Sequence, residues 1–261
     1  MLLLMTLLAC VDPNPSDGEW LLTWEDDFEG DAGAPPDGDV WVHDVGGGGW
    51  GNNQLEFNTD RVENAALDGQ GHLAITALRE AYEGNDFTSA RLKTKGRFDQ
   101  AGGRFEARIR LPEGQGLWPA FWLLGANIDE VGWPWCGELD VLEAQGEVPA
   151  TVYGTAHGPG ASGAGGIGGH YTLSDGSFAD DFHDLAVEID PGHVAWYVDG
   201  VLYQRLSEGD LPPNAVWVYD EPMFVLLNLA VGGHFVAPPT DATPFPATML
   251  VDWVRVSERG W

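Results

Sequence analysis

Positive charge is scarce in this chain. Lys93 and Lys95 are its only lysines, and 12 basic residues stand against 41 acidic ones, which gives a formal net charge of -29. A field of this sign repels the phosphates of nucleic acids and of anionic membrane surfaces, so neither is an expected partner. It also disfavours other polyanions as partners, whereas a neutral molecule meets no such repulsion. Solubility alone would equally explain the acidity.

Cysteine is scarce as well. Cys10 and Cys136 are the only two, and Cys10 ends an apolar N-terminal run, so we do not expect them to pair. This argues against a disulfide framework, and no Cys/His cluster indicates zinc. Aromatic residues, by contrast, are plentiful. The 12 tryptophans exceed what a core of this size usually needs, and surplus aromatics often line ligand clefts.

The first ten residues (MLLLMTLLAC) form an apolar run that is too short to span a bilayer as a helix. We interpret residues 1–10 as an export signal, or as the end of a longer signal if the start codon is misassigned. Residues 7–10 (LLAC) resemble a bacterial lipobox, which predicts a lipid on Cys10 as the one route to a membrane. The expected location is the bacterial cell envelope or the extracellular space. Residues 11–18 (VDPNPSDG) predict a tether, and residues 19–261 a single domain.

Strand patterns dominate that domain. Residues 105–111 (FEARIRL) alternate apolar and polar side chains, as in a half-buried strand. The Asp199-Gly200 dipeptide between two apolar stretches predicts a hairpin. Further strands are expected at residues 223–231 and 248–256, and no segment shows a long helical stripe. The pattern predicts an all-β sandwich of two antiparallel sheets.

Two glycine-rich stretches, residues 46–49 and 158–169, interrupt this pattern. Neither has the strand–loop–helix setting or the lysine of a phosphate-binding loop. We interpret both as flexible rims, the first leading into a turn at residues 50–53 (WGNN) that is suited to contact a sugar.

The motif that indicates chemistry is residues 137–143 (GELDVLE), with Glu138, Asp140 and Glu143 among large apolar residues. In a regular strand Glu138 and Asp140 share a face and Glu143 lies on the other. A β-bulge near residues 141–142 would bring all three acids to one cleft, with Leu139 and one of the next two residues toward the core. Retaining glycosidases need two carboxyl groups about 5–5.5 Å apart, and crowding would keep one of them protonated. The alternative is an acidic, exposed face on an edge strand.

The surrounding motifs resemble glycoside hydrolase family 16, in particular its laminarinase-like (endo-β-1,3-glucanase) branch. The resemblance extends over most of residues 24–256. It is carried by residues 47–57 (GGGWGNNQLEF), 88–96 (TSARLKTKG), 114–125 (GQGLWPAFWLLG), 132–143 (GWPWCGELDVLE), 154–157 (GTAH), 196–200 (WYVDG) and 227–233 (LNLAVGG).

This resemblance implies a β-jelly-roll sandwich with a substrate cleft across its concave sheet, and hydrolysis with retention of configuration. It assigns Glu138 as nucleophile, Asp140 as assisting acid and Glu143 as general acid/base. The two residues between Asp140 and Glu143 match the bulged form of the motif that is typical of laminarinases.

Further positions follow from the same resemblance. Trp118 and Trp122 match tryptophans of the cleft, with core packing as the alternative. Asn53 and Arg91 match polar residues on the glycone side, with an ion pair as the alternative for Arg91. His157 matches a histidine beside the acid/base. Trp133 lies just before the motif and is a further substrate-binding candidate, whereas Trp135 is larger than expected there.

The resemblance also implies a structural Ca²⁺ on the convex side, with Asp27 and Asp252 as ligands. Asp252 should share a strand face with Leu250 and Val254, where a metal or hydrogen bonds would have to compensate its charge. No cofactor is expected for catalysis, and nothing in the sequence suggests more than a monomer.

Two other classes of function stay open. The same scaffold could carry a mixed-linkage β-1,3-1,4-glucanase, an agarase or a carrageenase, although few basic residues are available for carrageenan sulfates. A non-catalytic β-glucan-binding protein is the second alternative, and relatives that only bind have lost the acids that remain here.

Overall fold

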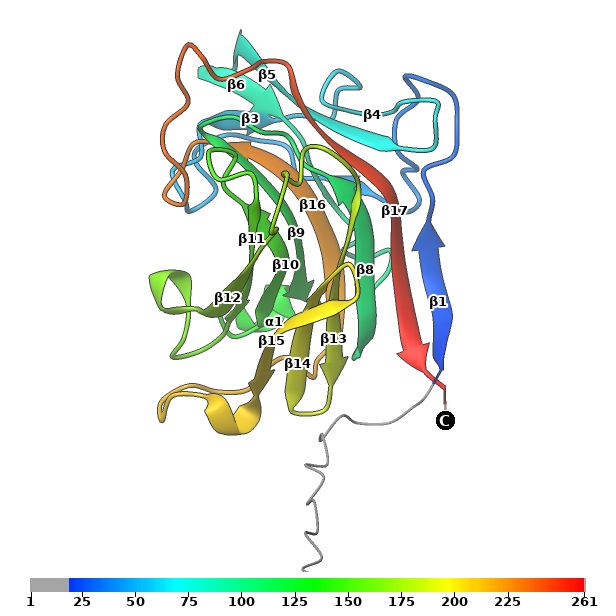
Figure 1. Ribbon diagram of the computed structural model, residues 1–261, viewed down its shortest axis with the longest axis vertical. Helices are drawn as coiled ribbons and strands as arrows, with labels where there is room; N and C mark the ends of the chain where they lie inside the picture. The colour runs from blue at the N-terminus through cyan, green and yellow to red at the C-terminus, as the bar shows by residue number, and fades with distance from the viewer. Residues whose placement is uncertain (1–18, 261) are drawn as a thin grey trace, which may run out of the picture.

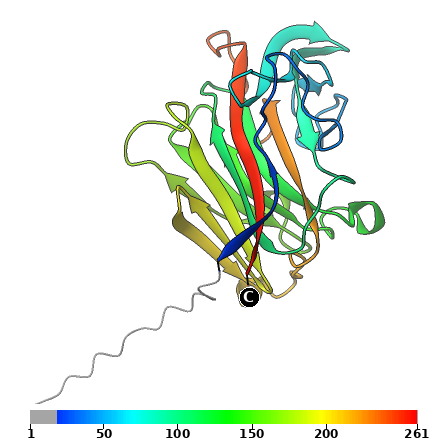
Figure 2. The same ribbon diagram turned by 90° about the vertical axis from the view of Figure 1, so that its right-hand side faces the viewer.

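The computed structural model describes residues 19–260. They form two sheets of mostly antiparallel strands that pack face to face, as Figures 1 and 2 show from two directions. The predicted all-β jelly-roll sandwich is confirmed. The predicted export segment with Cys10 and the tether, residues 1–18, lie outside the described residues.

The first sheet has ten strands in the order β15-β14-β13-β8-β17-β5-β6-β3, with β1 paired to β17 and β4 to β5. All pairs are antiparallel except β3–β6. Its strands are β1 Trp20–Asp26, β3 Glu56–Asn58, β4 Ala65–Leu67, β5 Leu73–Tyr82, β6 Asn85–Ser89, β8 Gly103–Arg110, β13 His183–Asp190, β14 His193–Val198, β15 Val201–Ser207 and β17 Ala247–Arg259.

The second sheet has seven strands in the order β12-β11-β10-β9-β16-β7-β2. In Figure 1, β10, β9 and β16 run side by side through the middle of the molecule. The strands are β2 Val42–His43, β7 Arg91–Lys93, β9 Leu117–Gly125, β10 Glu138–Ala144, β11 Thr151–His157, β12 Ile167–Thr172 and β16 Met223–Val231.

One large apolar core lies between the sheets. The predicted alternation in β8 is confirmed, because Phe105, Ala107 and Ile109 are fully buried while the residues between them are not. From the other sheet, Leu139, Val141 and Leu142 of β10 enter the same core. Burial of many such side chains is the main stabilising term in the fold.

The predicted hairpin is also confirmed, since β14 and β15 are joined by Asp199 and Gly200 with φ values of 49° and 75°. Positive φ at both positions matches the twist of the flanking strands. The glycine-rich rim predicted at residues 158–169 is wrong in part. Its last residues belong to β12, which pairs with β11 from Ile167 onward.

Helix is rare in residues 19–260. It comprises α1 Ile128–Val131 and the 3₁₀ turns η1 Gly163–Gly165 and η2 Glu208–Asp210. Within this range no helix has the length and apolar character needed to cross a bilayer.

Candidate active site

The site is organised by an irregularity in β10. Glu138 pairs with His157 and Asp140 with Thr155, but the next pair is Glu143 with Tyr153. Two residues of β10 therefore stand opposite one residue of β11, which is a β-bulge. Because Tyr153, Thr155 and His157 share a face of β11, their partners Glu138, Asp140 and Glu143 share a face of β10.

The bulge is seen from the other neighbour as well, since the register with β9 shifts between Asp140 and Leu142. The predicted bulge is thus confirmed, as is the common face of the three acids. One detail differs from the prediction. Both Val141 and Leu142 are buried in the core, at 1% and 0% exposure, because the extra residue is accommodated on the inner side.

Glu138 lies at the start of the strand, with its side chain 18% exposed. Its Oε2 accepts a hydrogen bond from Nε1 of Trp133 at 3.0 Å, and Nε2 of His157 lies 3.9 Å from its Oε1. Burial raises the pKa of Glu138, and the neighbouring Asp140 raises it further, while His157 and Trp133 act in the opposite direction.

Asp140 is the most enclosed of the three acids, with 6% of its side chain exposed. Its Oδ2 lies 3.1 Å from Nε2 of His157. Burial raises the pKa of Asp140 well above its ordinary range. His157 was predicted beside the general acid/base, Glu143, but the register of β11 places it opposite Glu138, and Tyr153 is the residue opposite Glu143.

Glu143 is the last of the three acids along β10. Its Oε1 accepts a hydrogen bond from Nε1 of Trp118 at 2.9 Å. Burial and the charge of Asp140 raise the pKa of Glu143 to about 8, against the lowering effect of the Trp118 hydrogen bond. Trp118 is itself only 8% exposed and packs against Phe235, so it is both a core residue and a partner of the acid.

Three buried carboxyl groups on one strand face cannot all be ionised together, because each charge raises the pKa of its neighbours. His157 lowers the pKa of both glutamates, whereas Arg91 interacts electrostatically with Glu138 alone of the three acids and so favours its charged form. Arg91 therefore favours Glu138 as the charged carboxyl and leaves Glu143 as the candidate for the protonated one. One charged and one protonated carboxyl on the same face are what a glycosidase needs.

Arg91 is the central residue on the side of the site next to Glu138. Its guanidinium lies between the rings of Trp50 and Trp122, at 5.1 and 4.6 Å from their centres. Its Nε is 3.1 Å from a carboxylate oxygen of Asp44, so the ion pair considered as an alternative is present. Trp122 is partly exposed and donates from Nε1 to Asn228.

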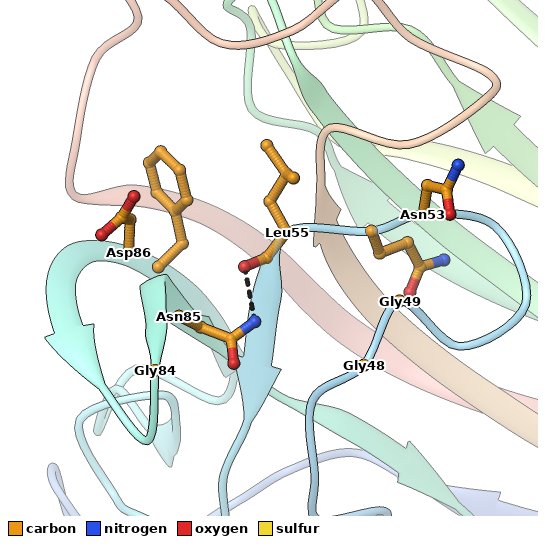
Figure 3. A pocket seen from close by; sticks show the side chains of 9 residues that line it. Gly48, Gly49, Asn53, Leu55, Gly84, Asn85 and Asp86 are labelled. Carbon is orange, nitrogen blue, oxygen red and sulfur yellow. Dashed lines mark hydrogen bonds between the residues drawn. The ribbon is translucent and has the colours of Figure 1, made fainter.

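Asn53 lies in the same loop as Trp50, residues 46–53, with its side chain next to that of His234. It borders a hollow of about 390 Å³ between the loop and the turn that precedes Phe87. Figure 3 shows this hollow, with Asn85 donating to the backbone oxygen of Leu55. Both polar and apolar side chains line this hollow, and the sugar contact of Asn53 stays a prediction.

The Glycosyl hydrolases family 16 model matches residues 50–255 of the chain. The chain belongs to this family. Over 97% of its length it is 39% identical to a beta-glucanase of Rhodothermus marinus, of which it covers 92%.

Solved structures agree with this family 16 assignment. An endo-beta-1,3-glucanase from Pyrococcus furiosus superimposes with a TM-score of 0.88 at 43% identity, covering 93% of this chain and 96% of that one. The laminarinase catalytic domain from Thermotoga maritima gives 0.87 at 44% identity, with 93% and 100% covered.

Several residues of this family 16 site were missed by sequence reasoning, and Trp50 was named only as part of the turn at residues 50–53. Asp44, Trp50 and Asn228 surround Arg91 and Trp122, and His234 contacts Asn53. Glu56 is fully buried and accepts a hydrogen bond from the backbone of Val231. Trp50, Asn228 and Glu56 lie within motifs quoted for the resemblance, but no local pattern distinguishes them there.

The predicted calcium ligands fit such an ion poorly. Asp27 is exposed, and the carboxylate of Asp252 lies 3.2 Å from Nε of Arg108, whose positive charge would oppose a cation. The expected strand face is wrong in part. Leu250 pairs with Arg110, and Asp252 contacts Arg108 on the same face, but a register shift between Val251 and Trp253 separates Asp252 from the buried Val254.

Among residues 19–260, one group of three acidic, histidine or cysteine side chains has ligand atoms close enough for a metal, within 4.8 Å of one another. It consists of Glu138, Asp140 and His157. Glu138 and Asp140 are two of the three acids on β10, and His157 contacts Asp140. We therefore assign this group to acid–base chemistry and not to metal binding.

Proposed function

We propose that this family 16 chain is an endo-β-1,3-glucanase that hydrolyses laminarin-type glucans with retention of configuration. The observation that carries the proposal is the bulge in β10, which sets Glu138 and Glu143 on one face with Asp140 between them. The similar proteins named above, a beta-glucanase, an endo-beta-1,3-glucanase and a laminarinase, support the substrate class.

In the first step, Glu138 attacks the anomeric carbon while Glu143 gives its proton to the departing glycosidic oxygen. The glucosyl–Glu138 ester retains one half of the chain, and the other half leaves as an alcohol. In the second step Glu143, now ionised, removes a proton from water, which attacks the same carbon and releases Glu138. Two inversions give net retention. No cofactor is needed, because both reacting groups are carboxyls.

The other residues support these two steps. Trp133 and Trp118 donate to Glu138 and Glu143, which holds each carboxyl in one orientation. Asp140 lies between the two glutamates and raises the pKa of both, whereas His157, opposite Glu138, lowers the pKa of both. Trp122 and Trp133 offer partly exposed rings for the apolar faces of glucose.

The decisive experiment measures reducing ends released from laminarin. The wild type should be active, and Glu138→Gln should lose several orders of magnitude in kcat while still binding glucan. In Glu143→Ala, azide should restore turnover of an aryl β-1,3-glucoside, whose leaving group departs without a proton, and yield a β-glucosyl azide, whereas Glu138→Ala with azide should yield the α-azide. Glu106→Gln, on the outer face of the other sheet, is the matched control. An unchanged rate in Glu138→Gln would remove this residue as nucleophile.

Stereochemistry and linkage need separate measurements. NMR of the first products should show the β-anomer, and an initial α-anomer would contradict double displacement. A panel of laminarin, curdlan, lichenan and agarose should give the highest kcat/KM on laminarin. Preference for lichenan would instead indicate a mixed-linkage enzyme, and binding without cleavage a glucan-binding protein.

We further infer that residues 1–10 direct export and that Cys10 carries a lipid, on the basis of the lipobox-like sequence. Labelling of cells with a radioactive fatty acid should mark the wild type and not Cys10→Ala. Equal labelling of both would contradict this proposal.

A further inference from the structure

One hydrogen bond joins the two sheets at the bulge itself. Nε1 of Trp196, in β14 of the ten-stranded sheet, donates to the backbone oxygen of Asp140 in β10 at 2.8 Å. Trp196 is fully buried and is among the largest enclosed side chains of residues 19–260. Asp140 is also the residue after which the register of β10 shifts against both neighbours. The indole thus holds the backbone where the strand departs from regular geometry.

The space for this indole comes from Gly154. On β11 the pairs flanking the bulge are Thr155 with Asp140 and Tyr153 with Glu143, so Gly154 is the single residue opposite the bulge. A Cβ on Gly154 would lie 2.5 Å from Cδ1 and 2.8 Å from Nε1 of Trp196, and closer still to the hydroxyl of Tyr203. Contacts this short do not occur in proteins, so any side chain at this position displaces the indole ring and the Tyr203 hydroxyl. The φ angle of Gly154 is not in the left-handed region, so the backbone itself accepts alanine.

A β-bulge can form at more than one position along a strand, and its position decides which face of the sheet the following side chains occupy. If nothing held the backbone at Asp140, the bulge in β10 could form at another position, and the side chain of Glu143 would then point away from Glu138. The hydrogen bond from the rigid indole in the opposite sheet holds the backbone at this position. Small errors in the placement of reacting groups cost about 10²-fold in rate.

We propose that Trp196 is a positioning residue for hydrolysis, seated against Gly154 and acting through the Asp140 carbonyl on the placement of Glu143. The inference rests on the proposed roles of Glu138 and Glu143. It is distinct from a packing role, because the indole N–H, and not only the ring, is required.

The first test is Trp196→Phe, which keeps an aromatic ring and removes the donor. We expect kcat on laminarin to fall about 10- to 100-fold with little change in KM. The alkaline limb of the pH profile should also move, because the pKa of Glu143 depends on its distance from Asp140. Phe105→Leu, in β8 of the same sheet and separated from β14 by β13, is the control. It should lower Tm and leave kcat and the pH profile unchanged.

The second test is Gly154→Ala, which keeps the indole and displaces it. We expect a fall in kcat similar to that of Trp196→Phe, and faster solvent exchange of the Trp196 Nε1 proton by NMR. Gly165→Ala, with no atom within 4 Å of the added Cβ, should change neither. The Gly154→Ala variant also carries the test if Trp196→Phe does not fold.

The double variant decides whether the two residues act together. If both act through the same hydrogen bond, Gly154→Ala with Trp196→Phe should lose little more kcat than the worse single variant. Fully additive losses, or a lower Tm with wild-type kcat and pH profile in either single variant, would overturn the proposal. Failure of the proposed function would appear differently, as undiminished activity in Glu138→Gln.

Discussion

The indole nitrogen of Trp118 lies 2.9 Å from Oε1 of Glu143, so the acid at the end of the row is held by a tryptophan of the adjacent strand β9. Trp133 makes the equivalent contact with Glu138 at the other end, at 3.0 Å. Each glutamate thus has one fixed N–H donor and one oxygen left for chemistry. The two donors come from different segments, which allows each glutamate to be perturbed separately.

Trp118→Phe should shift the alkaline limb of the kcat/KM profile to higher pH. The Trp118 N–H lowers the pKa of Glu143, so its loss raises this pKa further above the ordinary range and preserves the protonated acid at higher pH. The measurement is initial rate on laminarin across pH 5–10. Trp41→Phe, which loses an indole–carboxylate bond to Asp26, is the control and should keep the wild-type limb.

His157→Ala should shift the acidic limb of the same profile upward. The charge of His157 lowers the pKa of Glu138, which must be ionised to act as nucleophile. Without it, Glu138 stays protonated to higher pH and activity on the acidic side falls. His183→Ala, which removes a similar pair with Asp199, should leave the profile unchanged. An acidic limb that moves downward in His157→Ala would contradict this electrostatic role.

Arg91→Lys should raise KM for laminarin about 10-fold and change kcat by less than about 3-fold, because lysine keeps the charge but loses the planar contact with two rings. Arg255→Lys is matched to it, since Arg255 also lies over a tryptophan, Trp253, and pairs with a carboxylate, that of Glu25. Steady-state kinetics should show no effect of the control. A fall in kcat alone would assign Arg91 to the chemical step.

Glu56→Gln should stabilise the protein at neutral and alkaline pH. Burial raises the pKa of Glu56 to about 7, so its folded form binds a proton more tightly than its unfolded form. The stability contributed by the neutral carboxyl is complete below pH about 4.3 and is lost as pH rises through 7. We expect the variant to gain about 1–3 kcal/mol over the wild type at pH 8 and nothing at pH 4.

Glutamine can preserve the contacts of Glu56. Its oxygen can accept from the backbone of Val231, and Asn58 can turn its free side-chain oxygen toward the new amide. Urea unfolding at both pH values gives the measurement, with Glu106→Gln as control. An equal stability difference at pH 4 and pH 8 would show that ionisation of Glu56 is not the cause.

Removal of calcium should leave Tm unchanged within about 1 °C. Asp252 is already neutralised by Arg108, so a divalent cation would gain little there. Calorimetry in excess EDTA and in excess CaCl₂ gives the comparison. A rise in Tm with calcium that Asp27→Asn abolishes would restore the calcium site implied by the family resemblance.

Much of the site followed from local spacing. Two residues between Asp140 and Glu143 predict a bulge once both glutamates are required on one face, and the observed register agrees. The alternation in β8 and the Asp199-Gly200 turn were equally local. Each of these features depends on residues only a few positions apart, where strand geometry gives a definite rule.

The face of Asp252 shows where such reasoning ends. Alternation placed Asp252 with Val254, but a second irregularity, between Val251 and Trp253, separates them. No chemistry in that segment demanded a common face, so no irregularity was expected. The sequence pattern of a strand does not by itself reveal an extra residue. A bulge can be predicted only where a function requires particular side chains on one face.

The sequence by itself determined the strand content, the two-sheet class and the trio of acids, because alternation and turn residues act over a few neighbouring positions. Only the tertiary structure decided which tryptophans face the acids, how Glu56 becomes buried and how Trp196 meets Asp140, 56 residues away. Those contacts cross from strand to strand or sheet to sheet. These contacts arise from packing between segments that are distant in the chain. Local propensity carries no information about such packing, so the sequence alone could not predict them.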